Sequence, residues 1–256
     1  MNRRVADLLN QETTRFYQVQ AGSFSDTRKA AWPGWEQCAG FLKQLGPRVR
    51  LLDLACGNAR FERFLLRKLS GVNWSFSAVD SCDELVSFCT DSLSGVDFSY
   101  QQLDVVSALL DGSETLGLDC SGFYDACACF GFLHHVPGRE VRARALRGLV
   151  GQVRPGGLVM VSLWQFEKSE QIAEQARALR PQALADLHLD EGDLEPGDHL
   201  LGWKKTPGVY RYCHSFSSGE VNMLLDSVAD IAEPLDVFES DGRTGNLNTY
   251  LILRRM

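Results

Sequence analysis

Apolar residues in the middle of the chain gather in short runs that alternate with stretches of helical spacing. Short apolar runs bounded by turn residues indicate buried strands, and apolar residues at helical spacing indicate amphipathic helices. The pattern predicts strands over 49–54, 74–80, 97–104, 123–133 and 157–164. It predicts helices over 58–69, 82–93 and 139–153. Strands that alternate with helices in this way predict a parallel sheet with right-handed crossovers.

Two segments fall outside this alternation. Residues 1–48 are expected to form a helical cap, with a polar helix over 1–20 and a second helix that begins at Pro33. Residues 165–208 contain a polar helix followed by an acidic stretch. We expect this second segment to form an insertion over the active site.

The end of the chain predicts one more helix and two more strands. Ser217 and Glu220 have the spacing of a capping box, so a helix is expected to begin there. The stretches near 234–239 and 248–254 predict two strands that a hairpin can join. The predicted fold is therefore α/β, with a seven-stranded, mostly parallel doubly wound sheet of the Rossmann-like class. We expect a single domain over 1–256.

Composition narrows the class of protein. The 256 residues are 45% hydrophobic, enough for a full core. No stretch approaches the ~18 consecutive apolar residues of a membrane span, and residues 1–20 lack the apolar region of a signal peptide, so a cytoplasmic protein is expected. The eight cysteines form no CxxC pair and are expected to be buried, reduced thiols, with no metal site. A net charge of −7 argues against a stand-alone nucleic-acid-binding module.

The stretch DLACGNA, residues 53–59, is a tight turn of small residues between a predicted strand and a predicted helix. Open α/β sheets bind ligands at the carboxyl ends of their strands, and Gly57 lets a ligand approach the backbone closely. The turn lacks the G-x-G-x-x-G spacing that surrounds a pyrophosphate. Asp80 ends the second strand, where it can accept ribose hydroxyls, and Asp104 ends the third, where it could meet an adenine amino group. These positions predict a site for an adenosine without a diphosphate, as S-adenosylmethionine requires.

Longer motifs extend this pattern over residues 49–164. They are DLACGNARF after the first strand, VDSCDEL after the second and YDACACFGFLHHVPGRE along the fourth. The motifs resemble those of class I S-adenosylmethionine-dependent methyltransferases, although that family usually has glycine where this chain has Ala55 and Ala59. The resemblance implies S-adenosyl-L-methionine as the cofactor. It places this cofactor against Asp53, Ala55, Cys56, Gly57, Asn58, Asp80, Ser81, Asp104, Phe130 and Trp32.

A narrower likeness lies in the motifs FSDTRKAAWP, FLHHV, LGW and YRYCHSFSSGEV. They are similar to motifs of the tRNA wobble-uridine carboxymethyl methyltransferases, which esterify the carboxylate of 5-carboxymethyluridine. Arg28 and Arg211 are the candidate cations for that carboxylate, because guanidinium groups match carboxylates bidentately. One of the two could instead bind the cofactor's own carboxylate. His134 and His135 would orient the substrate or act as a base. The resemblance also implies tRNA as a partner, together with a small zinc-binding activator protein.

Other interpretations stay open. The subfamily motifs favour a tRNA substrate, whereas the net acidity favours a small carboxylate, hydroxyl or amine metabolite. The alanines in the first motif also allow a non-catalytic scaffold of the same fold. Two basic stretches, within 60–68 and 139–154, could follow RNA phosphates or simply be solvated helix faces.

Overall fold

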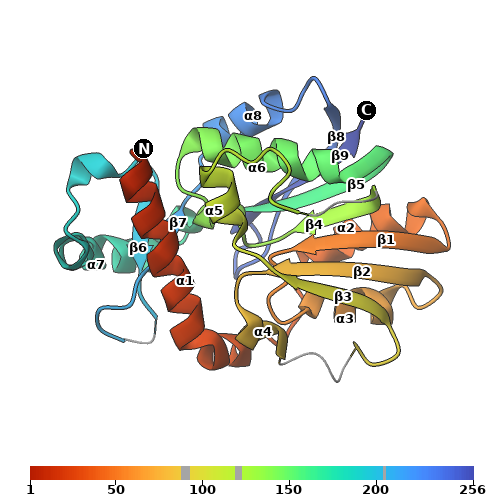
Figure 1. Cartoon of the computed structure of the whole chain (residues 1–256), viewed down its shortest axis with the longest axis horizontal. Coiled ribbons are helices and arrows are strands. Elements are labelled where there is room, and N and C mark those ends of the chain that lie inside the picture. Colours follow the sequence, from red (N-terminus) through yellow and green to blue (C-terminus); the bar gives the residue numbers. More distant parts are fainter. Residues whose placement is uncertain (88–92, 119–122, 204–205) are drawn as a thin grey trace.

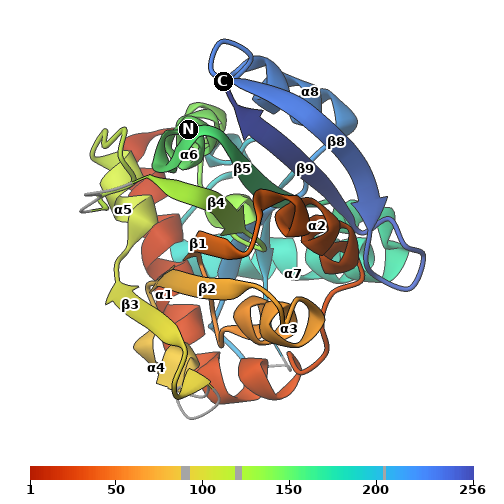
Figure 2. The same cartoon turned by 90° about the vertical axis from the view of Figure 1, so that its right-hand side faces the viewer.

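A seven-stranded sheet forms the centre of the computed structural model, which describes residues 1–87, 93–118, 123–203 and 206–256 (Figures 1 and 2). Its strands are β1 (Arg48–Leu54), β2 (Asn73–Asp80), β3 (Asp97–Gln102), β4 (Tyr124–Cys129), β5 (Val153–Trp164), β8 (Ala232–Ser240) and β9 (Asn248–Arg255). Their order is β3-β2-β1-β4-β5-β9-β8. Strands β1 to β5 run parallel, whereas β9 pairs antiparallel with β5 and with β8. The predicted fold class is confirmed.

Helices cover both faces of the sheet. They are α2 (Gly34–Leu42), α3 (Arg60–Lys68), α5 (Val105–Leu110), α6 (Arg139–Gln152) and α8 (Ser218–Asp226). Successive side chains of a strand point to opposite faces, so β1 serves two cores. Leu52 and Leu54 pack with residues of α5, α6 and α8, while Val49 and Leu51 pack with residues of α2 and α3. Burial on both faces is the reason that the strands read as continuous apolar runs.

A second group of elements lies beyond the carboxyl ends of the parallel strands (Figure 1). It consists of α1 (Arg3–Asp26), α7 (Glu170–Leu187), β6 (Asp198–Leu201) and β7 (Arg211–His214). Strands β6 and β7 form a separate antiparallel ribbon. Leu9 of α1, Leu184 of α7 and Tyr212 of β7 share one small apolar core. Packing thus joins the N-terminal helix to the segment that follows β5, and we call this group the cap.

Two predicted strand ends were wrong for local reasons. The strand expected over 123–133 ends at Cys129, because Gly131 takes a positive φ of 73° and the chain then enters a short 3₁₀ helix. The strand expected over 97–104 ends earlier because the side chain of Asp104 caps α5. Short capped turns of this kind carry no hydrophobic period that the sequence pattern could reveal.

Other differences concern elements that the pattern missed or cut short. Helix α1 continues to Asp26, and neither α5 nor β6 was predicted. Of the helix expected over 82–93, α4 (Asp83–Ser87) is present, and 88–92 lie outside the described residues. Six cysteines are buried, as expected, and form no disulfide among the described residues, whereas Cys89 and Cys120 lie outside those residues. In the described part of the chain, no helix is long and apolar enough to cross a membrane.

A buried polar network attaches the cap to the helices of the main domain. The guanidinium of Arg142 in α6 donates to the Tyr212 hydroxyl at 3.1 Å and to Glu195 at 2.9 Å. The Tyr212 hydroxyl donates to Asp198 at 2.6 Å. His214 lies 2.7 Å from Asp198 and 2.9 Å from Glu220. Because Arg142 is only 2% exposed, these partners rather than water stabilise its positive charge.

We expect Arg142→Ala to lower the free energy of unfolding by about 3 kcal/mol, because it leaves buried acceptors without their cation. Urea unfolding followed by circular dichroism measures this loss. Arg147→Ala is the matched control, since Arg147 is exposed and pairs with Asp230 at the surface. Its expected cost is below about 1 kcal/mol. Equal costs for the two variants would contradict a structural role for the network.

Candidate active site

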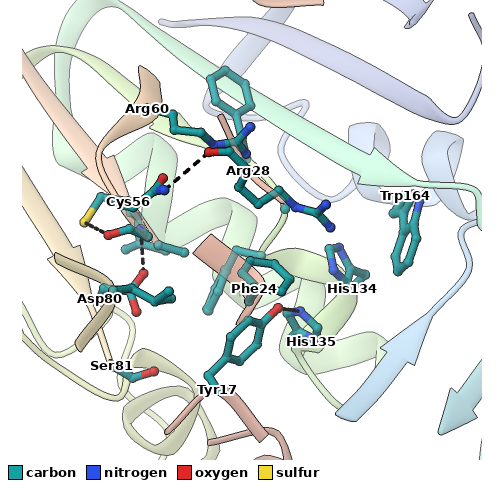
Figure 3. A pocket seen from close by; sticks show the side chains of 18 of the residues that line it. Tyr17, Phe24, Arg28, Cys56, Arg60, Asp80, Ser81, His134, His135 and Trp164 are labelled. Atoms are coloured by element: carbon teal, nitrogen blue, oxygen red, sulfur yellow. Dashed lines mark hydrogen bonds between the residues drawn. The ribbon is translucent and has the colours of Figure 1, made fainter. Parts of the chain in front are cut away.

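A cavity of about 450 Å³ lies between the carboxyl ends of the parallel strands and the cap. Strands β1, β2 and β5, the turn after β4, helix α1 and strand β7 all contribute side chains. Tyr17, Phe24, Arg28, His134 and His135 surround one part of it, and Asp80 and Ser81 lie at the other (Figure 3). All of the predicted site residues line this cavity: Arg28, Trp32, Asp53, Ala55, Cys56, Gly57, Asn58, Asp80, Ser81, Asp104, Phe130, His134, His135 and Arg211.

The turn after β1 has an unusual backbone. Ala55, Gly57 and Ala59 have φ values of 62°, 55° and 50°, in the left-handed region. Each alanine there costs about 1–2 kcal/mol relative to an unstrained conformation. The methyl group of Ala59 is fully buried and packs with Ala78 and Val86. Its burial offsets part of the free-energy cost of the left-handed backbone. A Cβ on Gly57 would meet nothing within 4 Å, so this backbone faces open cavity space.

Asp80 fixes this turn to the end of β2. One carboxylate oxygen accepts a hydrogen bond from the Gly57 N–H at 2.8 Å, and the other accepts from the Cys82 N–H at 3.0 Å. Burial raises the pKa of Asp80, and these backbone donors act in the opposite direction. Each oxygen keeps a second lone pair, so Asp80 can accept further bonds from a ligand hydroxyl.

We expect Ala55→Gly to raise the free energy of unfolding by up to about 1 kcal/mol, because glycine adopts a positive φ without strain. Ala59→Gly should be close to neutral, because it also removes a buried methyl group worth about 0.8 kcal/mol. Thermal and urea unfolding of both variants measure these changes. A destabilised Ala55→Gly variant would contradict the strain inferred for this turn.

Asp53 and Glu62 form a buried carboxyl pair behind the turn. Asp53 is 3% exposed and Glu62 is fully buried. Burial, followed by the negative field of Glu62, raises the pKa of Asp53, and burial raises the pKa of Glu62 to about 7. Two adjacent carboxyls cannot both ionise in such a place, so the pair holds a proton at neutral pH. Asp53 lines the cavity, so this carboxyl pair lies at the edge of the ligand site.

This raised pKa predicts a pH dependence of stability. Glu62 ionises near pH 4.5 in the unfolded chain and near pH 7 in the folded protein. The folded state therefore binds more protons between these values, and stability falls by about 1–3 kcal/mol as pH rises through that window. Glu62→Gln should flatten the slope of unfolding free energy against pH. Parallel wild-type and variant curves would disprove the assignment.

Arg211 is a buried cation without an acidic partner among the described residues. It is 6% exposed, and its guanidinium lies 5.1–5.8 Å from the ring centroids of four aromatic side chains. These rings belong to Phe16, Phe24, Trp164 and Trp203. One guanidinium nitrogen lies 3.4 Å from the Tyr17 hydroxyl, and Nε has no partner. A buried guanidinium with unused donors is a strong anion site.

Arg28 lies beside the same aromatic rings. Its guanidinium is 4.6 Å from the Phe24 ring centroid and 5.9 Å from that of Trp203. Burial, and then the positive field of Arg211, lowers the pKa of Arg28. The side chain extends toward His134 in the cavity (Figure 3). Arg28 and Arg211 therefore come together from distant parts of the chain, as expected, and present positive charge to one space.

The two histidines beside these arginines are neutral. Burial and Arg211 lower the pKa of His135 to about 3, and burial, followed by the field of His135, lowers the pKa of His134. His135 Nδ1 lies 2.7 Å from the Tyr212 carbonyl oxygen and must donate to it. Its Nε2 therefore accepts from the Tyr17 hydroxyl at 2.8 Å. His135 orients Tyr17 toward Arg211, whereas His134 keeps a buried Nδ1 without a partner.

His134, His135 and Cys213 could in principle hold a metal ion, since their ligand atoms lie within 4.8 Å of one another. Three features oppose this. Both ring nitrogens of His135 already have partners, burial raises the pKa of the Cys213 thiol to about 12, and the Arg211 cation is adjacent. The absence of a metal stays a prediction.

Several lining residues were missed from the sequence. Trp35 and Phe61 extend the aromatic wall that Phe130 and Trp32 begin. Helix α1 contributes a further set: Asn10, Thr13 and Thr14. Asn10, Thr13 and Tyr17 recur at helical spacing, and this polar stripe on a buried helix face was the signal available. Nothing in the sequence pointed to Asp241 or Asn248 of the final hairpin.

Comparisons with known proteins agree with this geometry. The fold is similar to that of an S-adenosylmethionine-dependent methyltransferase from Methanosarcina mazei, with a TM-score of 0.59 and 16% identity over 89% of this chain and 98% of that one. It is also similar to the S-adenosylmethionine-bound amino pentose methyltransferase CalS10 from Micromonospora echinaspora, with a TM-score of 0.56 and 14% identity over 93% and 97% of the chains. Residues 52–161 match the family model of a methyltransferase domain.

Residues 52–161 of this chain therefore form a methyltransferase domain. The expected enzyme class is confirmed. Among curated proteins, the methyltransferase is 31% identical over 159 residues to the tRNA (carboxymethyluridine(34)-5-O)-methyltransferase of Arabidopsis thaliana, covering 61% of this chain and 33% of that protein. It is 24% identical over 259 residues to the enzyme of that name from Xenopus tropicalis, covering 85% and 37%. The methyltransferase spans about a third of the length of these relatives.

Proposed function

We propose that this methyltransferase transfers the methyl group of S-adenosylmethionine to a carboxylate, and that a carboxymethylated wobble uridine of tRNA carries this carboxylate. The buried guanidinium of Arg211 has no acidic partner among the described residues and shares one cavity with the turn after β1, which supports an anionic acceptor. The names of the Arabidopsis thaliana and Xenopus tropicalis relatives support the choice of tRNA.

The residues at the strand ends fit the proposed cofactor. The backbone at Gly57 faces open cavity space, which a bound cofactor can approach closely. Asp80 would accept the ribose hydroxyls with its free lone pairs. The carboxylate oxygens of Asp104 already accept from Ser107 N–H and from Asn10, so its contact with an adenine amino group would use the remaining lone pairs. Phe130 and Trp32 would supply apolar walls.

The proposed chemistry asks little of the protein beyond positioning. The sulfonium of S-adenosylmethionine supplies an activated methyl group, and a carboxylate oxygen is already a nucleophile. Transfer to that oxygen would break the carbon–sulfur bond as the new carbon–oxygen bond forms, and it would require no proton to move. Neutral His134 and His135 are compatible with such a reaction, because no general base is needed. Arg211 and Arg28 would hold the carboxylate, and the aromatic rings around them would exclude water.

The remaining expectations are part of the same proposal. We regard 1–256 as one methyltransferase domain, in which 1–48 and 165–208 cover the active site. Contacts of Phe24 and Trp203 with Arg28 support this view of the cap. A cytoplasmic location stays an expectation from the composition of the chain, whereas a small zinc-binding activator protein follows only from the family resemblance. A small carboxylate metabolite is the second candidate substrate, which the net charge of −7 favours.

We expect Arg211→Lys to lower carboxylate methylation at least about tenfold, because a point charge cannot replace the bidentate guanidinium. Mass spectrometry of nucleosides from tRNA that carries 5-carboxymethyluridine measures the product. Calorimetry with S-adenosylhomocysteine should show unchanged cofactor affinity in this variant. Asp80→Ala is the complementary variant, and it should weaken that binding by about 1–3 kcal/mol.

Arg254→Lys is the matched control, since Arg254 near the end of β9 is exposed and pairs with Glu233 of β8. If the protein methylates a hydroxyl or an amine, and Arg211→Lys leaves the rate of that methylation unchanged, the anionic acceptor is refuted. Methylation of a free carboxylate but not of tRNA would favour the metabolite instead. A failure to bind S-adenosylhomocysteine at millimolar concentration would leave only the scaffold interpretation.

A further inference from the structure

A second cavity, of about 370 Å³, adjoins the first on its outer side. The two share Ser25, Arg28, Asn58 and Arg60 as lining residues. The second cavity contains one acid, Asp26, and an excess of cations: Arg28, Lys29, Arg60, Arg63 and Arg67. In a chain with a net charge of −7, this concentration of positive charge beside the active site is a local feature.

None of these five cations forms an ion pair with an acid in the part of the chain that the structure describes. Lys29, Arg63 and Arg67 do not line the first cavity, and we call them the α3 basic surface. By contrast, Lys68 on the same helix pairs with Glu36. Unpaired cations held near one another repel, so the surface gains from an anion that neutralises it.

Arg60 links this surface to the active-site cavity. Its guanidinium donates to the Ala30 carbonyl at 2.8 Å and lies 5.4 Å and 5.2 Å from the ring centroids of Trp32 and Trp35. Burial, followed by the fields of Arg28 and Arg63, lowers the pKa of Arg60 to about 10. It remains charged at neutral pH, so positive charge continues from the exposed helix into the cavity.

The other basic stretch of the sequence behaves differently. Arg142 is buried in the network with Glu195, and Arg147 and Arg154 pair with Asp230 and Asp125 at 2.6 Å and 2.7 Å. These arginines of α6 and of the start of β5 therefore form ion pairs with acids of the protein itself. Arg139 and Arg144 of that stretch form no ion pair among the described residues, but neither lines either of the two cavities. Of the two stretches that the sequence offered for phosphate binding, only the one on α3 therefore keeps unpaired cations beside the cavity.

We propose that the α3 basic surface binds the phosphodiester backbone of a single-stranded RNA segment whose modified base enters the active-site cavity. This inference rests on the proposed RNA substrate. Arg60, Arg63 and Arg67 recur on one face of α3 over about 10 Å, long enough to meet more than one phosphate. Arginine is well suited to this contact, since its planar fork matches phosphate oxygens. An acidic protein or an anionic membrane is the competing partner. Neither of them would require the positive charge to continue from the surface into the cavity.

The double variant Arg63→Ala with Arg67→Ala tests the proposal. Binding of an RNA stem-loop with 5-carboxymethyluridine in its loop is measured by fluorescence anisotropy over a range of salt concentrations. We expect affinity to fall about tenfold or more, and the slope of log affinity against log salt to shrink by about 1 to 1.5, as for two lost phosphate contacts. The matched control, Arg147→Ala with Arg177→Ala, removes two exposed arginines whose partners are Asp230 and Glu170. It should bind RNA like the wild type.

Kinetics distinguish this proposal from the proposed function. The ratio of kcat/KM on the RNA to kcat/KM on the free nucleoside should fall at least about tenfold in the Arg63, Arg67 variant and stay constant in the control. Equal RNA affinity and salt slope in variant and wild type overturn the α3 surface, even if tRNA is methylated. Wild-type binding to vesicles of anionic lipid or to acidic peptides, without binding to RNA, overturns it as well. Salt-dependent RNA binding through Arg63 and Arg67 without methylation of the RNA supports the surface and refutes the wobble-uridine substrate.

Discussion

The hydrogen bond from the Gly57 N–H to the Asp80 carboxylate determines the geometry of the active site. It joins the turn after β1 to the end of β2 and leaves Asp80 facing the cavity. The left-handed backbone at residues 55, 57 and 59 then turns the chain directly into α3. That helix carries the arginines of the adjoining cavity. A single backbone constraint thus positions both the cofactor side of the active site and its basic border.

The cap supplies the other half of the site, and buried polar contacts rather than apolar packing alone fix its position. Strand β7 places Arg211 in the cavity, while the next residue, Tyr212, joins Arg142 and Asp198 in the network below it. The Tyr212 carbonyl also accepts from His135, which in turn orients Tyr17. Because each of these groups is buried, a displacement of β7 would leave several donors and acceptors unpaired. The cost of that displacement keeps the guanidinium of Arg211 in place.

The arginines of the protein differ in whether they form ion pairs within it. Most arginines of α6 and α7 form ion pairs within the protein, whereas Arg28 and Arg211 in the cavity and the α3 basic surface outside it have no acidic partners among the described residues. A chain with net charge −7 can therefore still present a continuous positive path. Net charge describes solubility and long-range attraction, but a binding surface depends on which cations remain unpaired.

The sequence by itself determined the alternation of strands and helices. Strands of a parallel sheet are buried on both faces, and such strands appear in the sequence as continuous apolar runs. The sequence also identified Gly57, Asp80 and the other strand-end residues, since parallel strands bring their carboxyl ends to one edge. Only the tertiary structure decided that α1 completes the cavity, that burial raises the pKa values of both Asp53 and Glu62, and that the arginines of α3 rather than those of α6 line the adjoining cavity. These facts depend on contacts between residues far apart in the chain, and such contacts have no period in the sequence.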